Sequence, residues 1–275
     1  MLKNIRTYLN REGITLLAPV LLHDCRITRP YLLEREGIAD GTAIIFAVPY
    51  ATPHSDGRNV SAYAAVRDYH IFFGDLFASL LPALQKDFPN HRFAGFSDHS
   101  PIDEIHAALI AGLGVKGDNG LLLTELYSSY VFIGEIITDA ILPVTPVSPA
   151  ECLHCGACRR ACPVALDKSQ CLSALTQKRG DLTEEEYARL DDHPLVWGCD
   201  SCQEACPYTV AAGKRGTLYE TPPFFQNRIC PALTVESLDR MDEETFRSRA
   251  YSWRGRAVIR RNLLRKEEKN KDHIT

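Results

Sequence analysis

The sequence predicts an N-terminal domain of α/β (or α+β) class followed by a smaller cysteine-rich domain. Strand-like and helix-like patterns alternate up to Leu142, a proline-rich connector occupies residues 143–149, and eight of the ten cysteines fall between residues 152 and 206. A chain of 275 residues is long enough for two compact domains. We therefore expect three parts: a first domain over residues 1–142, a cysteine-rich domain over 143–240 and a basic helical tail over 241–275.

Helix and strand signals can be placed in order along the first domain. Residues 42–49 form an apolar, β-branched run typical of a buried strand, and residues 60–84 carry helical spacing with few breakers. We expect a short strand over 92–97, just before Asp98, and then a helix over 101–111 with Ser100 as its N-cap. Residues 121–142 predict a hairpin or strand pair.

The second half carries different local signals. Prolines in residues 143–149 each fix φ and disfavour helix in the preceding residue, as is typical of a domain connector. Thr183 and Glu186 have the spacing of a capping box, so a short helix should begin there. From Arg247 onward, ten lysines and arginines stand against three acidic residues. Such a tail could contact nucleic-acid phosphates, although basic helical tails are more often simply solvated.

The composition is that of an ordinary globular protein, with 45% hydrophobic residues, 24% charged residues and a formal net charge of −4. The longest apolar runs are far shorter than the roughly 20 residues that cross a bilayer, so no membrane span is expected. The N-terminus has no apolar region of the kind found in signal peptides. We therefore expect a cytoplasmic protein, in which grouped cysteines are more often metal ligands than disulfides.

Eight cysteines have the spacing of ligands to two [4Fe–4S] clusters. One run is C-x2-C-x2-C-x3-C-P from Cys152 to Pro163, and the other is C-x2-C-x3-C-P from Cys199 to Pro207. In such runs three thiolates converge on one cluster and the Cys-Pro cysteine ligates the other. The second run lacks one ligand, which Cys171 supplies. We assign one cluster to Cys152, Cys155, Cys158 and Cys206, and the other to Cys162, Cys171, Cys199 and Cys202.

Structural zinc is the alternative metal, because it also uses four-cysteine sites. Zinc gives no reason for the third cysteine of the first run or for the Cys-Pro endings, so iron–sulfur clusters account for more of the pattern. The isolated Cys25 and Cys230 are expected to be small buried hydrophobes. Two clusters in one ferredoxin-like domain are typical of an electron wire, so an acceptor site should lie in residues 1–142.

The order of motifs resembles the epoxyqueuosine reductase family, whose members depend on cobalamin and iron–sulfur clusters. The resemblance covers nearly the full chain and rests on the cysteine runs together with short motifs. Those motifs are residues 60–70 (VSAYAAVRDYH), 98–104 (DHSPIDE), 111–114 (AGLG), 132–138 (FIGEIIT), 170–176 (QCLSALT) and 198–207 (GCDSCQEACP).

This resemblance implies a cobalamin held between the first domain and the clusters, which reduces epoxyqueuosine in tRNA to queuosine. The cofactor carries the hard chemistry and the protein supplies orientation and protons. Asp98 matches the family's proposed proton donor, whereas the residues alone favour a role for Asp98 in capping the turn before Ser100. An external electron donor of ferredoxin or flavodoxin type is implied as a partner.

Further residues are candidates for cofactor contact. Tyr63, Arg67 and His70 fall on one predicted helix, where a histidine is more often a packed or surface residue. Gly112 and Gly114 could let the backbone approach the corrin, and a helix end followed by a turn explains them equally well. Glu135, on an apolar strand face, should be buried and either structural or site-lining.

Departures from the family leave the substrate open. Glu104 is followed by Ile105 where the family has a basic residue, and residues 116–119 (KGDN) replace the usual Gly-Lys-Asn. The family also continues, after the segment matching residues 260–264, into helical repeats that help to hold tRNA, so tRNA remains an open partner. The alternatives are a cobalamin-dependent reductase of another small substrate, such as an organohalide, and a non-catalytic ferredoxin-like electron-transfer protein.

Overall fold

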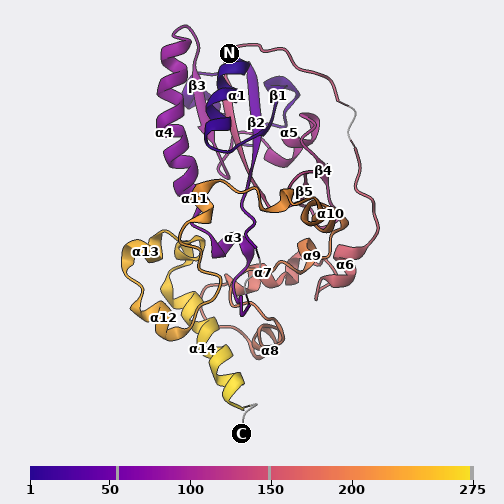
Figure 1. The fold of residues 1–275 in the computed structure, drawn as a ribbon, viewed down its shortest axis with the longest axis vertical. Helices are drawn as coiled ribbons and strands as arrows, with labels where there is room; N and C mark the ends of the chain where they lie inside the picture. The colour runs from indigo at the N-terminus through magenta and orange to yellow at the C-terminus, as the bar shows by residue number, and fades with distance from the viewer. Residues whose placement is uncertain (54–55, 148–149, 273–275) are drawn as a thin grey trace. The chain divides into compact units, whose positions relative to one another are not determined.

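The computed structural model describes residues 1–53, 56–147 and 150–272, and it divides into two compact units (Figure 1). Unit 1 comprises Met1–Tyr50, Tyr69–Cys155 and Tyr208–Pro223, and unit 2 comprises Ala51–Asp68, Gly156–Pro207 and Phe224–Thr275. The domain boundaries expected at residues 142 and 240 do not coincide with these units, because each unit combines three separate segments of the chain. Within the predicted connector, residues 148 and 149 lie outside the described residues.

A four-stranded antiparallel sheet forms the centre of unit 1. Its order is β1-β2-β6-β3, made of β1 (Leu16–Leu21), β2 (Thr42–Pro49), β6 (Val131–Thr138) and β3 (Phe93–Phe96). Every residue of β2 is buried, because a strand in mid-sheet with helices on both faces reaches no solvent. The strands expected over residues 42–49 and 92–97 are confirmed. Since all pairings are antiparallel, the mixed fold is of the α+β kind.

Helices cover the two faces of this sheet differently. On one face lies α4 (Tyr69–Asp87), against which α1 (Leu2–Arg11) also packs; Gly134 of β6 leaves the space that Phe73 of α4 fills. The other face carries α2 (Pro30–Glu36) and α5 (Glu104–Ile110), whose Ala107 joins the core cluster that includes Ile45 of β2. In Figure 1, α4 and α5 lie on opposite sides of the strands.

Two predicted elements differ from the structure because contacts distant in sequence decide them. The helix expected over 60–84 is divided into α3 (Ala62–Ala65) and α4, because Val66 is extended and Arg67 forms a β-bridge with Arg249. The hairpin expected over 121–142 is wrong in its pairing: β5 (Leu122–Leu123) pairs with β4 (Val115–Lys116), while β6 enters the central sheet. An eight-residue apolar strand buries more surface between β2 and β3 than in an isolated hairpin.

The helix expected over 101–111 begins later, at Glu104. The side chain of Asp103 accepts the N–H of His106 and is the N-cap, whereas the hydroxyl of Ser100 accepts the N–H of Ile102 in the preceding turn. Ser100 therefore organises the turn before the helix rather than the helix itself. The other short elements of this part are η1 (Leu22–Asp24), α10 (Pro207–Arg215) and η3 (Thr217–Tyr219).

Unit 2 is helical, and the predicted capping box is confirmed. The Thr183 hydroxyl accepts the N–H of Glu186, and the Glu186 carboxylate accepts the N–H of Thr183, at the start of α8 (Glu184–Asp192). The remaining helices are α6 (Ala157–Ala161), η2 (Lys168–Gln170), α7 (Leu172–Thr176), α9 (Ser201–Glu204), α11 (Pro223–Gln226), α12 (Val235–Arg240), α13 (Glu243–Arg247), η4 (Ala250–Arg254) and α14 (Arg256–Asp272).

The basic C-terminal segment is part of this helical unit. Helix α14 packs against α7, α8 and α12. Its Asn262 is fully buried and donates to the carbonyl oxygens of Thr176 and Val196, at 2.8 Å each. The segment predicted as a helical tail is helical, but it is not a separate tail, because one face of α14 is buried in the core of unit 2. Among the described residues, none of the helices combines the length and apolar character that a membrane span needs.

We predict that Gly134→Ala destabilises unit 1. A Cβ at Gly134 would overlap the ring of Phe73 and come within 2.7 Å of the ring of Phe46. Overpacking of this kind costs about 1–3 kcal/mol in the free energy of unfolding, measurable by urea denaturation. Gly74→Ala is the matched control, because nothing lies within 4 Å of that Cβ on helix α4. The control should gain about 0.5–1 kcal/mol, and equal stability of both variants would contradict the packing described here.

Candidate functional site

The predicted catalytic aspartate lies at one end of the strands of the unit 1 sheet, which we call the site edge of the sheet. Strands β2 and β3 both run antiparallel to β6: β2 ends opposite Val131, the first residue of β6, and β3 ends opposite Glu135 in the middle of β6. Asp98 follows β3 at this edge, and its Oδ2 atom lies 3.6 Å from Nε2 of His70 at the start of α4. The two side chains are 66% and 58% exposed. The structure therefore brings two of the predicted site residues together in a position that a ligand can reach.

A row of stacked aromatic rings lies at the same edge. Phe132 stacks on Tyr69 with ring centres 4.5 Å apart and 18° between the planes, and on Tyr50 with centres 4.4 Å apart. The imidazole of His70 lies 4.1 Å from the ring of Tyr69. Offset stacking at such distances stabilises the row and fixes the orientation of the rings. The row fixes the ring of Tyr69 and, next to it, the imidazole of His70.

The backbone at Asp98 is held in a left-handed conformation, with φ at +64°. Non-glycine residues adopt this region infrequently, so neighbouring contacts must stabilise it. The N–H of Asp98 donates to Oε1 of Glu104 over 2.8 Å, and the Ser97 hydroxyl donates to the carbonyl of Ile133 over 3.1 Å. The turn is thus fastened both to helix α5 and to strand β6.

Glu104 and Glu135 form a pair of carboxyl groups beneath this turn. Glu135 is fully buried, as the sequence predicts, and burial raises its pKa well above the usual range, with a further rise from Glu104. Burial also raises the pKa of Glu104, to about 7. The sequence reveals Glu135 as an acid on an apolar strand, but nothing in it indicates that Glu104 lies opposite, because that pairing depends on how α5 packs across the sheet.

The other predicted cofactor contacts have local structural roles. The hydroxyl of Tyr63 accepts hydrogen bonds from Nε1 of Trp197 and Nε2 of Gln177, at 3.0 and 3.2 Å, and burial raises its pKa. The guanidinium of Arg67 lies 3.9 Å from the centre of the Phe224 ring. Tyr63 and Arg67 both lie in unit 2. Their contact with a cofactor stays a prediction.

Gly112 and Gly114 are also explained by their immediate surroundings. Gly112 follows helix α5 with φ at +76°, as a glycine at a helix end commonly does. A Cβ on Gly114 would overlap the carbonyl of Leu123 in strand β5. Both glycines therefore allow the chain to approach itself, and their contact with a corrin ring remains untested.

All ten cysteines are free of disulfides, so their thiols are available as ligands. Cys158 lies on α6, Cys162 follows that helix, and Cys202 lies on α9, which packs against α6. Burial raises the pKa of the Cys199 thiol, and the charge of Cys171 adds to the rise. Thiolates in such short helical turns are the donors that [4Fe–4S] clusters use.

The two isolated cysteines differ from the grouped ones. Cys25 is buried in the unit 1 core, and burial raises the pKa of its thiol to about 12. This agrees with its expected structural role, since a neutral thiol is a poor ligand and a poor nucleophile. Cys230 is half-buried beside the apolar core of unit 2, so it is less enclosed than expected.

A buried ion pair supports the second cysteine run. The Asp200 carboxylate, between Cys199 and Cys202, lies 2.5 Å from Nη1 of Arg58 and also accepts the N–H of Ala62. Hydrogen bonds made by Thr176 and His193 to the peptide groups of Gly198 fix the residue that precedes Cys199. These contacts fix the backbone on either side of Cys199, a predicted cluster ligand. Arg58 carries no motif signal, because it reaches Asp200 across 142 residues of sequence.

A carboxylate–imidazole pair lies beside the first cysteine run. Its carboxylate comes from Asp118, within residues 116–119 (KGDN). Nδ1 of His154 lies 2.8 Å from Oδ1 of Asp118. One possible ligand atom from each of Asp118, Cys152 and His154 lies within 4.8 Å of the others. Because Cys152 is already assigned to a cluster, the acid–imidazole pair is best described as a neighbour of that ligand.

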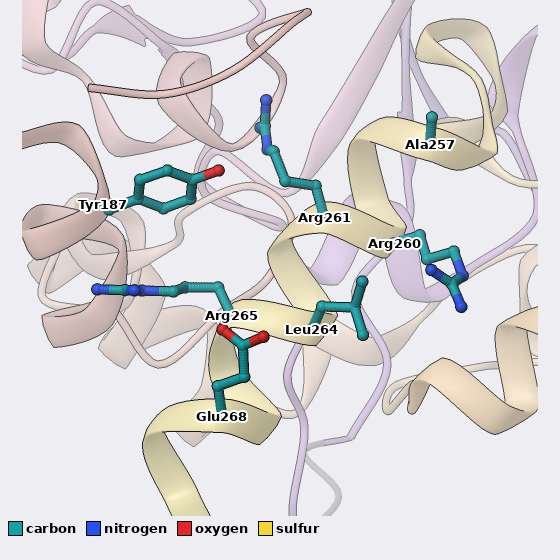
Figure 2. Close-up of a pocket in the computed structure, with 7 residues that line it drawn as sticks. All are labelled: Tyr187, Ala257, Arg260, Arg261, Leu264, Arg265 and Glu268. Atoms are coloured by element: carbon teal, nitrogen blue, oxygen red, sulfur yellow. The ribbon is translucent and has the colours of Figure 1, made fainter. Parts of the chain in front are cut away.

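A pocket of about 500 Å³ in unit 2 lies along the outer face of α14 (Figure 2). Its arginines are engaged within the protein: Arg260 pairs with Asp239, Arg265 pairs with Asp191, and Arg261 donates to the carbonyl of Lys178. The guanidinium of Arg265 also faces the ring of Tyr187, as Figure 2 shows. These contacts fasten α14 to its neighbours, and the nucleic-acid contact considered for this segment stays a prediction. The lining residues are Tyr187, Ala257, Arg260, Arg261, Leu264, Arg265 and Glu268.

We predict that Tyr63→Phe lowers stability. Removing the hydroxyl leaves the buried indole N–H of Trp197 without its acceptor, which costs about 1–3 kcal/mol in the free energy of unfolding, while Gln177 still donates to the carbonyl of Ser173. Urea denaturation measures the loss, with Tyr219→Phe, at a more exposed tyrosine, as the control that should change little. A Tyr63→Phe variant as stable as the parent would show that this hydroxyl does not anchor unit 2.

Comparisons with known proteins place the chain among curated relatives. Epoxyqueuosine reductase from Listeria monocytogenes is 33% identical over 210 residues, which cover 72% of this chain and 53% of the relative. Epoxyqueuosine reductase from Gloeobacter violaceus is 31% identical over 232 residues, covering 80% of this chain and 71% of the relative. The chain thus spans about half the length of the first and more of the second. No family model matches the chain.

Solved structures agree in fold. Epoxyqueuosine reductase from Streptococcus thermophilus superposes with a TM-score of 0.74 at 21% identity, covering 97% of this chain and 80% of that one. An epoxyqueuosine reductase solved with an epoxyqueuosine-modified tRNA stem loop has a TM-score of 0.70 at 21% identity, over 96% and 80% of the two chains. The structural likeness establishes the fold, and the sequence relatives establish the family. The chain belongs to the epoxyqueuosine reductase family.

Proposed function

We propose that the protein reduces epoxyqueuosine in tRNA to queuosine, using a bound cobalamin and two [4Fe–4S] clusters. One observation carries this proposal: an exposed Asp98 stands beside His70 and the aromatic row at one sheet edge. Membership of the family and the disulfide-free cysteine runs support it. The relative solved with a modified tRNA stem loop supports tRNA as the substrate. Because the chain spans only part of its relatives, substrate and activity are proposals for this protein.

The reaction sets clear requirements. Converting an epoxide to an alkene breaks two C–O bonds and releases the oxygen as water, which consumes two electrons and two protons. When bound, the clusters would supply electrons singly and the cobalamin would supply the reducing centre, with an external ferredoxin or flavodoxin as the source of electrons. The protein itself must orient the base, shield it from water and deliver protons.

The side chains at the sheet edge suit these tasks. The carboxyl group of Asp98 would deliver a proton to the departing oxygen, and His70, 3.6 Å away, is positioned to interact with the carboxylate that remains. The stacked rings of Tyr69 and Phe132 would support a flat macrocycle or base by apolar contact. The family resemblance also proposes cofactor contacts for four residues away from this edge of the sheet. They are Tyr63, Arg67, Gly112 and Gly114.

The cysteine assignments remain part of the proposal. The effect of Cys171 on the pKa of Cys199 supports placing both in the cluster that also takes Cys162 and Cys202. The proposed ligands of the other cluster are Cys152, Cys155, Cys158 and Cys206.

A second candidate function is reduction of another small substrate by the same machinery. The Asp118–His154 pair favours it, because residues 116–119 place an acidic group, Asp118, beside Lys116 in a segment whose motif in the family, Gly-Lys-Asn, has none. Such a change weakens attraction for an anionic substrate such as RNA.

The proposed function can be tested with anaerobically purified protein. We expect ultraviolet–visible spectra to show iron–sulfur absorption and, after addition of cobalamin, a bound corrinoid; reduced protein should then convert an epoxyqueuosine-containing tRNA stem loop to the queuosine form. Cobalamin binding without turnover would favour another substrate. Failure to retain any cobalamin would favour an electron-transfer protein.

We predict about eight iron atoms and eight labile sulfides per chain, because eight spaced thiolates can hold two clusters. Cys171→Ala should lose about half of the iron, and Cys25→Ala, at the buried thiol, should keep all of it. Iron and sulfide analysis of anaerobic preparations measures both. Equal losses in the two variants would refute the ligand assignment, and stoichiometric zinc in place of iron would refute the clusters.

Asp98→Asn should lower kcat by about 10²–10⁴-fold, the usual contribution of a positioned general acid. Asparagine preserves the shape of the side chain but cannot deliver the proton, so cobalamin binding and iron content should be unchanged. Asp75→Asn, at an exposed aspartate on α4, is the control and should retain full turnover. Turnover by Asp98→Asn at the parent rate would leave Asp98 with the role of a turn residue only.

A further inference from the structure

Glu135 is a buried acid that the proposed chemistry does not use. It lies opposite Ile45 of β2 and Phe96 of β3, so its side chain points into the apolar layer between the sheet and α5. Among the described residues, neither of its carboxyl oxygens makes a hydrogen bond of ordinary geometry. A buried carboxylate with no partner is strongly disfavoured, so this group must be neutral or share a proton.

Glu104 is the group that can share this proton. It is the first residue of α5, the helix that packs on the face of the sheet into which Glu135 points, and its negative charge adds to the rise in the pKa of Glu135. Oε1 of Glu104 also accepts the N–H of Asp98 over 2.8 Å. One carboxyl group therefore connects the buried acid to the backbone of the proposed proton donor.

The connection acts at the strained point of the turn. Asp98 has φ at +64°, and the hydrogen bond from its N–H favours that conformation over the extended ones that aspartate prefers. Glu104 can hold the N–H only while its own carboxyl group stays oriented. A hydrogen bond from protonated Glu135 would provide that orientation from below, in a region that water does not reach.

We propose that Glu104 and Glu135 share a proton and act together as a positioning pair that holds the Asp98 turn and so presents the Asp98 carboxyl group to substrate. Its catalytic part rests on the proposed function, whereas the pair and its effect on the turn do not. Both glutamates are positioning residues, since they act through Asp98.

The surrounding charges set when the pair titrates. Burial and the negative charge of Asp98 raise the pKa of Glu104, to about 7, while Arg29, whose guanidinium donates to the carbonyl of Ser100, lowers it. Below about pH 7 both carboxyl groups are protonated; above it Glu104 is ionised and accepts from Asp98 and from Glu135. The other groups that interact with Glu135 are the hydroxyl of Ser100 and the thiol of Cys25.

The first test uses amide hydrogen exchange in the cobalamin-free protein. Glu104→Met removes the acceptor and should raise the exchange rate of the Asp98 N–H at least tenfold, whereas Glu104→Gln keeps an oxygen acceptor and should keep most of the protection. Glu125→Gln, at an exposed glutamate of the same unit, should change nothing. Unchanged exchange in Glu104→Met would overturn the proposal, whatever the activity of the protein.

The second test asks whether a proton is shared. Infrared spectra of the cobalamin-free protein well above pH 7, where Glu104 is ionised and Glu135 keeps the proton, should contain the C=O band of a protonated carboxyl group, which Glu135→Gln removes and Glu125→Gln retains. A group whose pKa is higher in the folded than in the unfolded state lowers stability as the pH rises between the two values, so the free energy of unfolding should fall between about pH 4.5 and pH 7. Glu104→Gln should flatten this slope. Absence of the band together with an unaltered slope in Glu104→Gln would exclude proton sharing.

The third test connects the pair to turnover. Glu104→Met should lower kcat at least tenfold with little change in KM, iron content or cobalamin binding, and Glu104→Gln should restore most of kcat while losing the change in rate near pH 7. A parent protein that shows no epoxyqueuosine turnover would contradict the proposed function alone, because hydrogen exchange and infrared spectra still decide the pair. Full kcat in Glu104→Met would contradict the positioning role.

Discussion

The pairing of β6 with both β2 and β3 is the constraint on which the rest of unit 1 depends. Because β6 is antiparallel to both neighbours, β2 ends opposite the first residue of β6 and β3 ends opposite its middle, so both strands run toward the end of the sheet at which Tyr50, Phe132 and Asp98 lie. The alternation of side chains along β6 then assigns a different task to each face. Gly134 admits the aromatic rings of α4, while Glu135 on the other face lies under α5.

Local chemistry made part of this arrangement predictable from the sequence. Strand β2 is a continuous apolar run, and the capping box at Thr183 satisfies its own backbone donors, so neither depends on distant partners. The division of the helix after Ala65 could not be predicted in this way, because a bridge to Arg249 decides it. The same applies to the site: Asp98 stands out after a strand, whereas its support by Glu104 and Glu135 depends on packing across the sheet.

The cysteine region illustrates the same limit. Cysteine spacing alone indicates the ligand set, since three thiolates of one run must converge within a short loop. The contacts that hold such a loop leave no mark in the spacing. Arg58 and Thr176 support the residues around Cys199, yet the first is 142 residues from its partner Asp200 and the second belongs to another helix. Sequence motifs therefore identify chemistry more readily than its scaffold.

The interleaved make-up of the two units bears on how this architecture can be inherited. Unit 2 takes in Ala51–Asp68, which supplies Arg58 to Asp200 and pairs Ser61 with Trp197. A gene segment that encoded only residues 156–275 would lack both contacts. Unit 2 is therefore not a continuous segment that end-to-end gene fusion could attach to an unrelated protein with these contacts intact, and Cys152 and Cys155 of the first cysteine run lie outside it.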